Sequence, residues 1–96
     1  MQNQSWQVIE DYNKKHGLEH NQETVFYHLI EEVGELTREL YYNKNDWRGE
    51  EFNKEKFFEE LIDVLDKLLI LAKDFDVDIE TAYKNKMAKF RKRFEI

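Results

Sequence analysis

The chain has 96 residues, which suits one domain near the lower size limit for a single hydrophobic core. Apolar residues make up 41% and charged residues 38%, which is too apolar for a disordered chain and too charged for a membrane protein. The lack of cysteine excludes disulfides and thiolate chemistry, and a net charge of −6 argues against general nucleic-acid binding. No basic segment precedes an apolar one, so we expect no secretory signal and a cytoplasmic location.

The chain has no proline and three glycines, which favours helices throughout. Apolar residues recur at spacings of three and four, and they predict helices at about 5–15, 22–42 and 54–74, with a fourth after Asp78. Gly17 is expected to stop the first helix, and Asn21 to cap the second. The predicted fold is therefore all-α, a compact bundle of about four helices in one domain, residues 1–96, completed by dimerisation.

Several positions carry more specific expectations about packing. Ile62 and Leu69 give the third helix a second apolar face, which is typical of a central helix or a dimer seam. Gly34 lies inside a helical pattern at a cost of about 1 kcal/mol relative to alanine, so we expect close packing or a ligand there. Trp47 and Phe52 are expected to fold back onto the body of the protein. The last helix is expected to turn one row inward: Ala82, Tyr83, Met87, Phe90 and Phe94.

Acidic residues gather on one stripe of the second predicted helix. On a helical wheel, this stripe carries no lysine or arginine, and it consists of His28, Glu32, Glu35 and Glu39. Like charges one turn apart destabilise an isolated helix by roughly 0.2–0.5 kcal/mol. A bound cation is one way to offset that repulsion.

The third predicted helix offers a second acidic pair, Glu60 and Asp63, three residues apart. Two facing helices with such pairs would form an all-oxygen site suited to Mg²⁺ or Mn²⁺. The wheel leaves a second interpretation open, a solvated charged face on which Lys56 and Lys67 supply counter-charges. Lys67 is equally compatible with a surface ion pair and a phosphate contact. His28 is either a surface or capping histidine or a contact to substrate.

The residues around these acids resemble a known family. The second helix reads HLIEEVGEL and the third EELIDVL, which together fit E-E-x-x-E, a spacer, and E-x-x-D. The ending KFRKRF is similar to the K-F-x-x-R-F ending of the same group. From residue 21 onward the chain thus resembles the MazG-type nucleotide pyrophosphohydrolases. One departure is that charged Asp66 and Lys67 stand where the family usually has apolar or aromatic residues, which changes the expected nucleoside pocket.

The resemblance implies an all-α enzyme that forms dimers or dimers of dimers. It implies Mg²⁺-dependent hydrolysis of nucleoside triphosphates, NTP or dNTP, to the monophosphate and pyrophosphate, with Mn²⁺ as a substitute metal. Glu31 would hold a second ion or orient the attacking water. The metal ligands implied by position are Glu32, Glu35, Glu60 and Asp63.

The last helix is rich in basic residues that could meet the substrate. Lys86, Lys89 and Arg93 are the predicted phosphate contacts, although a helix dipole also favours a solvated basic C-terminus. Base recognition would use aromatic stacking, and the candidate residues are Trp6, Phe26, Trp47 and Tyr83. Each of them is also compatible with an ordinary position in the hydrophobic core.

Two other functions remain open from the sequence. A phosphoribosyl-ATP pyrophosphohydrolase has a similar acid pattern, but it usually has a lysine-rich lead-in and a histidine near the position of Lys67. A non-catalytic helical interaction module would also be acidic on one side and basic at its end. The sequence does not fix the base and sugar preference, the number of metal ions, or the choice between dimer and tetramer.

Overall fold

The computed structural model describes residues 1–45 and 53–96, and only the backbone of residues 42–45. Within these ranges it contains four helices and no strand: α1 (Gln2–His16), α2 (Gln22–Asn45), α3 (Lys54–Asp74) and α4 (Ile79–Phe94). The predicted all-α fold is therefore confirmed. The expectations for Trp47 and Phe52 fall outside the described residues. None of the described helices is both long and apolar enough to span a membrane.

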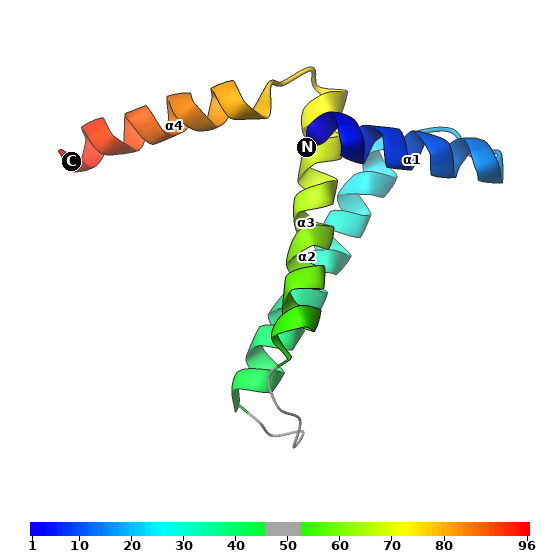
Figure 1. The fold of residues 1–96 in the computed structure, drawn as a ribbon, viewed down its shortest axis with the longest axis horizontal. Helices are drawn as coiled ribbons and strands as arrows, with labels where there is room; N and C mark the ends of the chain where they lie inside the picture. Colours follow the sequence, from blue (N-terminus) through cyan, green and yellow to red (C-terminus); the bar gives the residue numbers. More distant parts are fainter. Residues whose placement is uncertain (46–52) are drawn as a thin grey trace.

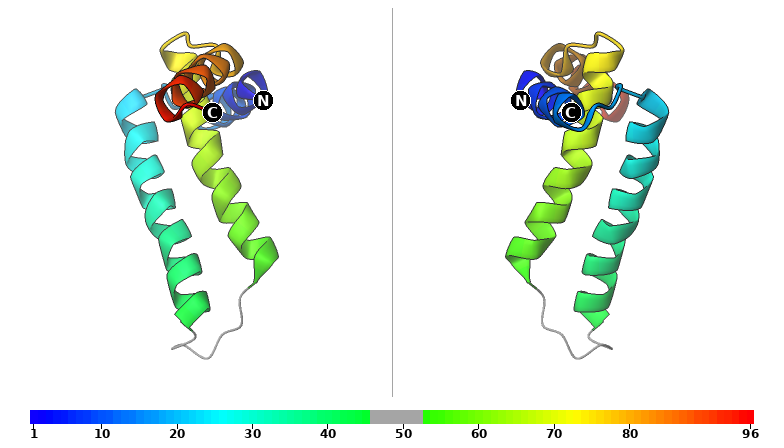
Figure 2. Two further views of the ribbon diagram at one scale, coloured as in Figure 1. Left: turned by 90° about the vertical axis from the view of Figure 1, so that its left-hand side faces the viewer. Right: turned by 90° about the vertical axis from the view of Figure 1, so that its right-hand side faces the viewer.

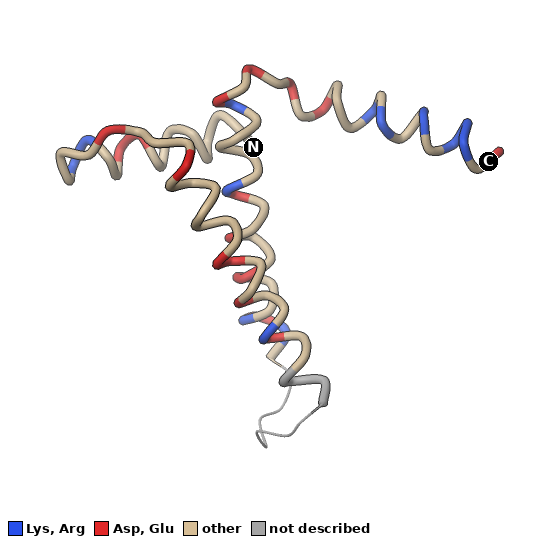
Figure 3. Tube along the Cα trace, turned by 180° about the vertical axis from the view of Figure 1, so that it is seen from behind, with Lys and Arg blue, Asp and Glu red and all other residues tan. Residues whose placement is uncertain are grey.

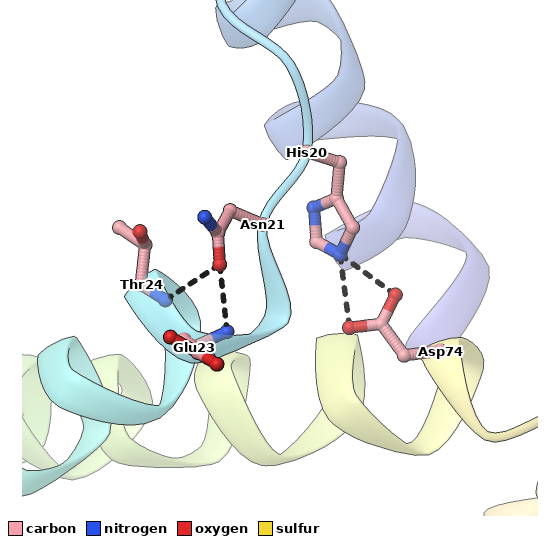
Figure 4. Close-up of polar contacts among 5 residues, drawn as sticks. All are labelled: His20, Asn21, Glu23, Thr24 and Asp74. Atoms are coloured by element: carbon pink, nitrogen blue, oxygen red, sulfur yellow. Dashed lines mark hydrogen bonds and ion pairs between the residues drawn. The ribbon is translucent and has the colours of Figure 1, made fainter.

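Local capping signals set the helix ends. Gly17 adopts a left-handed conformation with φ 64° and ψ 31°, and its N–H closes onto the last turn of α1. The Oδ1 of Asn21 accepts hydrogen bonds from the backbone N–H groups of Glu23 at 2.9 Å and Thr24 at 3.3 Å (Figure 4). Asn53 caps α3 in the same way, accepting from a first-turn N–H at 3.0 Å. Both predictions, for Gly17 and for Asn21, are confirmed.

The long helices α2 and α3 run antiparallel and side by side, and α1 crosses the C-terminal end of α3 (Figures 1 and 2). The buried core lies at this crossing, where all three helices meet. Ile70 is its most buried side chain, with 1% of its surface exposed. The core and the residues packed against it are Val25, Ile70, Leu71, Trp6, Ile9 and Leu29.

Polar contacts tie α1 and the following loop to the far end of α3. The Nε2 of His20 lies 2.7 and 2.9 Å from the two carboxylate oxygens of Asp74 (Figure 4), and its ring meets that of Trp6 edge-on at 4.9 Å. Gln2 donates to the carbonyl oxygen of Val77 at 3.0 Å and accepts from the first N–H of α4 at 3.1 Å. These contacts fix the corner from which α4 leaves.

Helix α4 projects from that corner and points away from α2 (Figure 1). The radius of gyration is 16.7 Å, whereas a compact domain of this size would have about 13 Å. A compact bundle is thus not reached within one chain. The expected inward row is wrong for Ala82, which is exposed, and for Tyr83 and Phe94, which are 65% and 60% exposed, because α4 has little of its own chain to pack against. Among the described residues, a Cβ at Gly34 would meet nothing within 4 Å, so the expectation of close packing within the chain is also wrong.

Candidate metal centre

The antiparallel pairing of α2 and α3 brings acidic residues from both helices to one place. Glu32 comes from α2, and Glu60 and Asp63 come from α3. One carboxylate oxygen of each residue lies within 4.8 Å of those of the other two. Three carboxylates at this spacing can share one cation.

Glu35 joins the same cluster from the next turn of α2. It lies within hydrogen-bonding reach of Glu32 and of Glu60, and its charge acts on both. The structure thus assembles both predicted pairs, and we call Glu32, Glu35, Glu60 and Asp63 the acidic cluster. Glu31 is exposed beside it.

The end of the acidic stripe takes a different partner. Glu39 forms an ion pair with Lys56, with 3.1 Å between Oε1 and Nζ. Lys56, one turn before Glu60, therefore directs its ammonium to α2. The acidic stripe is therefore charge-compensated at Glu39, towards the C-terminal end of α2, whereas the four acids of the cluster lie further along the helix pair.

The acidic cluster is electrostatically unfavourable without a cation. Oε2 of Glu32 and Oε2 of Glu60 are buried and have no hydrogen-bond partner within the described part of the chain, whereas buried polar atoms are normally bonded. Burial raises the pKa of Glu32, and the charges of Asp63 and Glu35 raise it further, against the opposing charge of Lys67. Burial and the charges of Glu35, Asp63 and Glu32 likewise raise the pKa of Glu60. Unsatisfied carboxylate oxygens fit a hard divalent cation such as Mg²⁺.

A cavity of about 330 Å³ lies one helical turn from the acidic cluster, between α1, the loop after it, α2 and α3. His28 and Lys67 line it, and they are each four residues from an acid of the cluster, Glu32 and Asp63 respectively. Tyr12 of α1 also lines it. Tyr12 was not predicted from the sequence to be a cavity residue, although its spacing of three from Ile9 on the expected first helix was an available signal.

The structure does not bring the predicted phosphate contacts Lys86, Lys89 and Arg93 to the acidic cluster within one chain. All three are on α4, which points away from the acidic residues of α2 and α3 (Figure 3). The Nζ of Lys86 lies over the ring of Phe90 at 5.0 Å, and the guanidinium of Arg93 lies over that of Phe94 at 5.5 Å.

The predicted stacking residues lie apart from one another. Trp6 packs against the core, and it also lines a second hollow beside α1. Phe26 and Tyr83 are exposed on α2 and α4. Trp47 lies outside the described residues. Tyr12, rather than any of these four, is the aromatic side chain that lines the cavity next to the acidic cluster.

Comparison with known proteins identifies a family. The model of the MazG nucleotide pyrophosphohydrolase domain matches residues 20–95, a range that contains α2, α3, α4 and the whole acidic cluster. The chain matches no curated protein and no solved structure. The match supports nucleotide pyrophosphohydrolase activity, and the family's general dependence on divalent metals agrees with the acidic cluster.

Proposed function

Because the chain belongs to the MazG nucleotide pyrophosphohydrolase family, we propose that it hydrolyses nucleoside triphosphates, NTP or dNTP, to the monophosphate and pyrophosphate with the aid of Mg²⁺. One observation carries the proposal: two carboxylate pairs converge across α2 and α3, and two of their buried oxygens have no hydrogen-bond partner among the described residues. The availability of such substrates favours a cytoplasmic location.

The acidic cluster would hold the metal, Mg²⁺ or in its place Mn²⁺. A divalent cation supplies positive charge to phosphate oxygens and lowers the pKa of water near it. The chain's own part is to present Glu32, Glu35, Glu60 and Asp63 as a fixed set of oxygens on two packed helices. Glu31, exposed beside the cluster, would orient the attacking water or help to hold a second ion.

Charge explains why the metal is needed for substrate binding. Four carboxylates alone would repel a triphosphate, and bound cations reverse the sign of the local potential. In the described part of the chain, Lys67 is the cation that acts on the pKa of Glu32, and a single ammonium does not balance the cluster.

We also propose that the active protein is a homodimer or a dimer of dimers. Tyr83 and Phe94 on α4 are largely exposed, and Met87 faces an open apolar groove against α3 that a second copy can fill. Lys86, Lys89 and Arg93 can act on phosphate only if association brings α4 to the acidic cluster of another copy, because α4 points away from its own.

The test is product analysis on all common nucleoside triphosphates with Mg²⁺, comparing two neighbouring substitutions. Glu60→Gln should lower pyrophosphate release at least about a hundredfold, since it removes charge complementarity made mainly in the transition state. Glu59→Gln, an exposed neighbour on the same helix, should stay within a few-fold of wild type. Equal activity of the two variants, or release of single phosphate by wild type, would reject the proposal and favour an interaction module.

A further inference from the structure

Lys67 is an unusually enclosed lysine. Its side chain is 19% exposed, whereas lysines usually lie on the surface. Its observed hydrogen bond in the described part of the chain goes to Oδ2 of its neighbour Asp66 at 3.4 Å, which is long for a charged pair. An ammonium has three donors, so one long contact leaves it able to bind a further anion.

Lys67 stands at a boundary between two parts of the site. On one side its charge reaches Glu32 of the acidic cluster, and Asp63 lies one turn before it on α3. On the other side it lines the cavity of about 330 Å³, together with His28. A ligand that occupies the cavity and extends to the cluster must therefore pass Lys67.

The cavity has the size and lining of a small-molecule site, for which volumes of roughly 300–1,000 Å³ are typical. Tyr12, whose ring centroid lies 4.5 Å from that of His16, contributes an aromatic ring to the lining, and Asn13, Asn21 and His28 contribute hydrogen-bonding groups. Aromatic faces stack on nucleobases of any kind, while amides and imidazole bond to base edges and sugar hydroxyls. The apolar part of the lining consists of Ile9, Val25, Leu18 and Ile70. This combination fits a nucleoside.

We propose that Lys67 binds the α-phosphate of the substrate, with the nucleoside in the cavity and the β- and γ-phosphates beyond it. The inference rests on the proposed function. A nucleoside triphosphate is a linear chain of groups, so the phosphate that lies at the boundary is the one bonded to the nucleoside. Hydrolysis leaves that phosphate on the monophosphate, so Lys67 distinguishes the two products: it contacts the monophosphate and not the pyrophosphate.

The test measures the binding of each product separately by calorimetry on the full chain with Mg²⁺. The probes are inorganic pyrophosphate and the nucleoside monophosphate that corresponds to the best substrate. Lys67→Met should weaken monophosphate binding about tenfold or more, the usual loss for a charge-assisted hydrogen bond, and leave pyrophosphate binding within about twofold. Lys67→Arg should restore most of the monophosphate affinity.

Lys73→Met is the matched control. Lys73 is an exposed lysine near the end of the same helix, and its Nζ donates to Oδ1 of Asn3 at 3.0 Å, away from the cavity. Lys73→Met changes the net charge by the same amount as Lys67→Met, and it should alter neither the monophosphate affinity nor the pyrophosphate affinity. Circular dichroism checks the fold, and Lys67→Gln takes the place of Lys67→Met if the methionine variant does not fold.

Two results would overturn the inference while leaving the proposed function intact. One is wild-type monophosphate affinity in a folded Lys67 variant, when the wild-type protein releases pyrophosphate normally. The other is an equal loss of monophosphate and pyrophosphate affinity, which would mean that Lys67 acts only through the overall charge of the cluster. If the wild-type protein releases no pyrophosphate from any nucleoside triphosphate, both the inference about Lys67 and the proposed function are rejected.

Discussion

The α2–α3 pair and helix α4 differ in how much of their environment one chain supplies. The two helices of the pair run side by side (Figure 1), form the core with α1, and bring together the four carboxylates of the acidic cluster. Helix α4 has exposed aromatic side chains and carries its basic residues away from those carboxylates. Under the proposed function, one chain would supply the acidic part of the site, and the basic residues of α4 would reach it only through association with another copy.

The two regions also differ in what stabilises them. Most helical stability in proteins comes from tertiary packing, because isolated helices shorter than about 12–15 residues are marginal in water even for good helix-forming sequences. The buried run Leu69, Ile70 and Leu71 fixes α3 in this way, whereas α4, with 16 residues, has no buried residue in one chain. Helix α4 therefore has most to gain from a second copy.

The largest expected effect is on the free energy of unfolding, and it should differ between the core of the α2–α3 pair and the surface of α4. Ile70→Ala should lower the free energy of unfolding by about 2–5 kcal/mol, because it leaves a cavity where the side chain is 1% exposed. Tyr83→Ala should cost less than about 0.5 kcal/mol in dilute protein, since 65% of that side chain is exposed in one chain. Urea unfolding at several protein concentrations measures both.

Protein concentration makes this comparison sharper. If α4 packs against a second copy, Tyr83→Ala should reduce the rise of melting temperature with protein concentration. A large loss of stability for Tyr83→Ala that is the same at every concentration would mean instead that α4 packs within its own chain.

The second effect concerns the metal. Adding Mg²⁺ to metal-free protein should raise its melting temperature, by an amount equivalent to about 2.7 kcal/mol when free Mg²⁺ is a hundredfold above its dissociation constant. Glu35→Gln should lose most of this response, because Glu35 faces both Glu32 and Glu60. Glu59→Gln should respond as wild type does. Equal responses of Glu35→Gln and wild type would place the Mg²⁺ site elsewhere.

Local signals explain what the sequence could predict of the fold. The predicted helix at 54–74 matches α3, and the other predicted bounds agree with the structure to within about three residues. Gly17 and Asn21 act through neighbouring backbone groups, so their roles are readable from a few positions. The acidic pairs follow from helical periodicity, and short connections make α2 and α3 antiparallel neighbours. Their role as ligands stays a prediction.

What the sequence could not predict depends on contacts between distant segments. An apolar stripe on α4 predicts an inward face, but it does not reveal that the chain itself covers little of that face. His20 and Asp74 meet across a separation of 54 positions, which no local pattern encodes. The same holds for the cavity, whose walls come from three helices and whose Tyr12 lies far along the chain from Lys67. Gly34 shows that a costly residue type alone does not imply close packing.

The smallest expected effect is a pH dependence confined to the acidic cluster of the metal-free protein. Glu32 and Glu60 have folded-state pKa values raised above the ordinary value of 4.5, chiefly by burial. Between 4.5 and the raised values, the folded state thus binds more protons than the unfolded state. Stability must then fall as pH rises through this window, because the unfolded state releases those protons more easily.

This contribution can be measured by urea unfolding in the presence of a chelator, from pH 4.5 towards neutrality. It is the difference in the free energy of unfolding between wild type and a variant that carries both Glu32→Gln and Glu60→Gln. The wild type should lose stability relative to the double variant as pH rises, since glutamine does not titrate. Glu59→Gln should follow wild type. Saturating Mg²⁺ should reverse the trend near neutrality, because ionised carboxylates bind the cation that protonated ones do not. A difference that stays flat or rises with pH would mean that the two glutamates are not held in an unfavourable cluster, and it would weaken the contrast between the pair and α4.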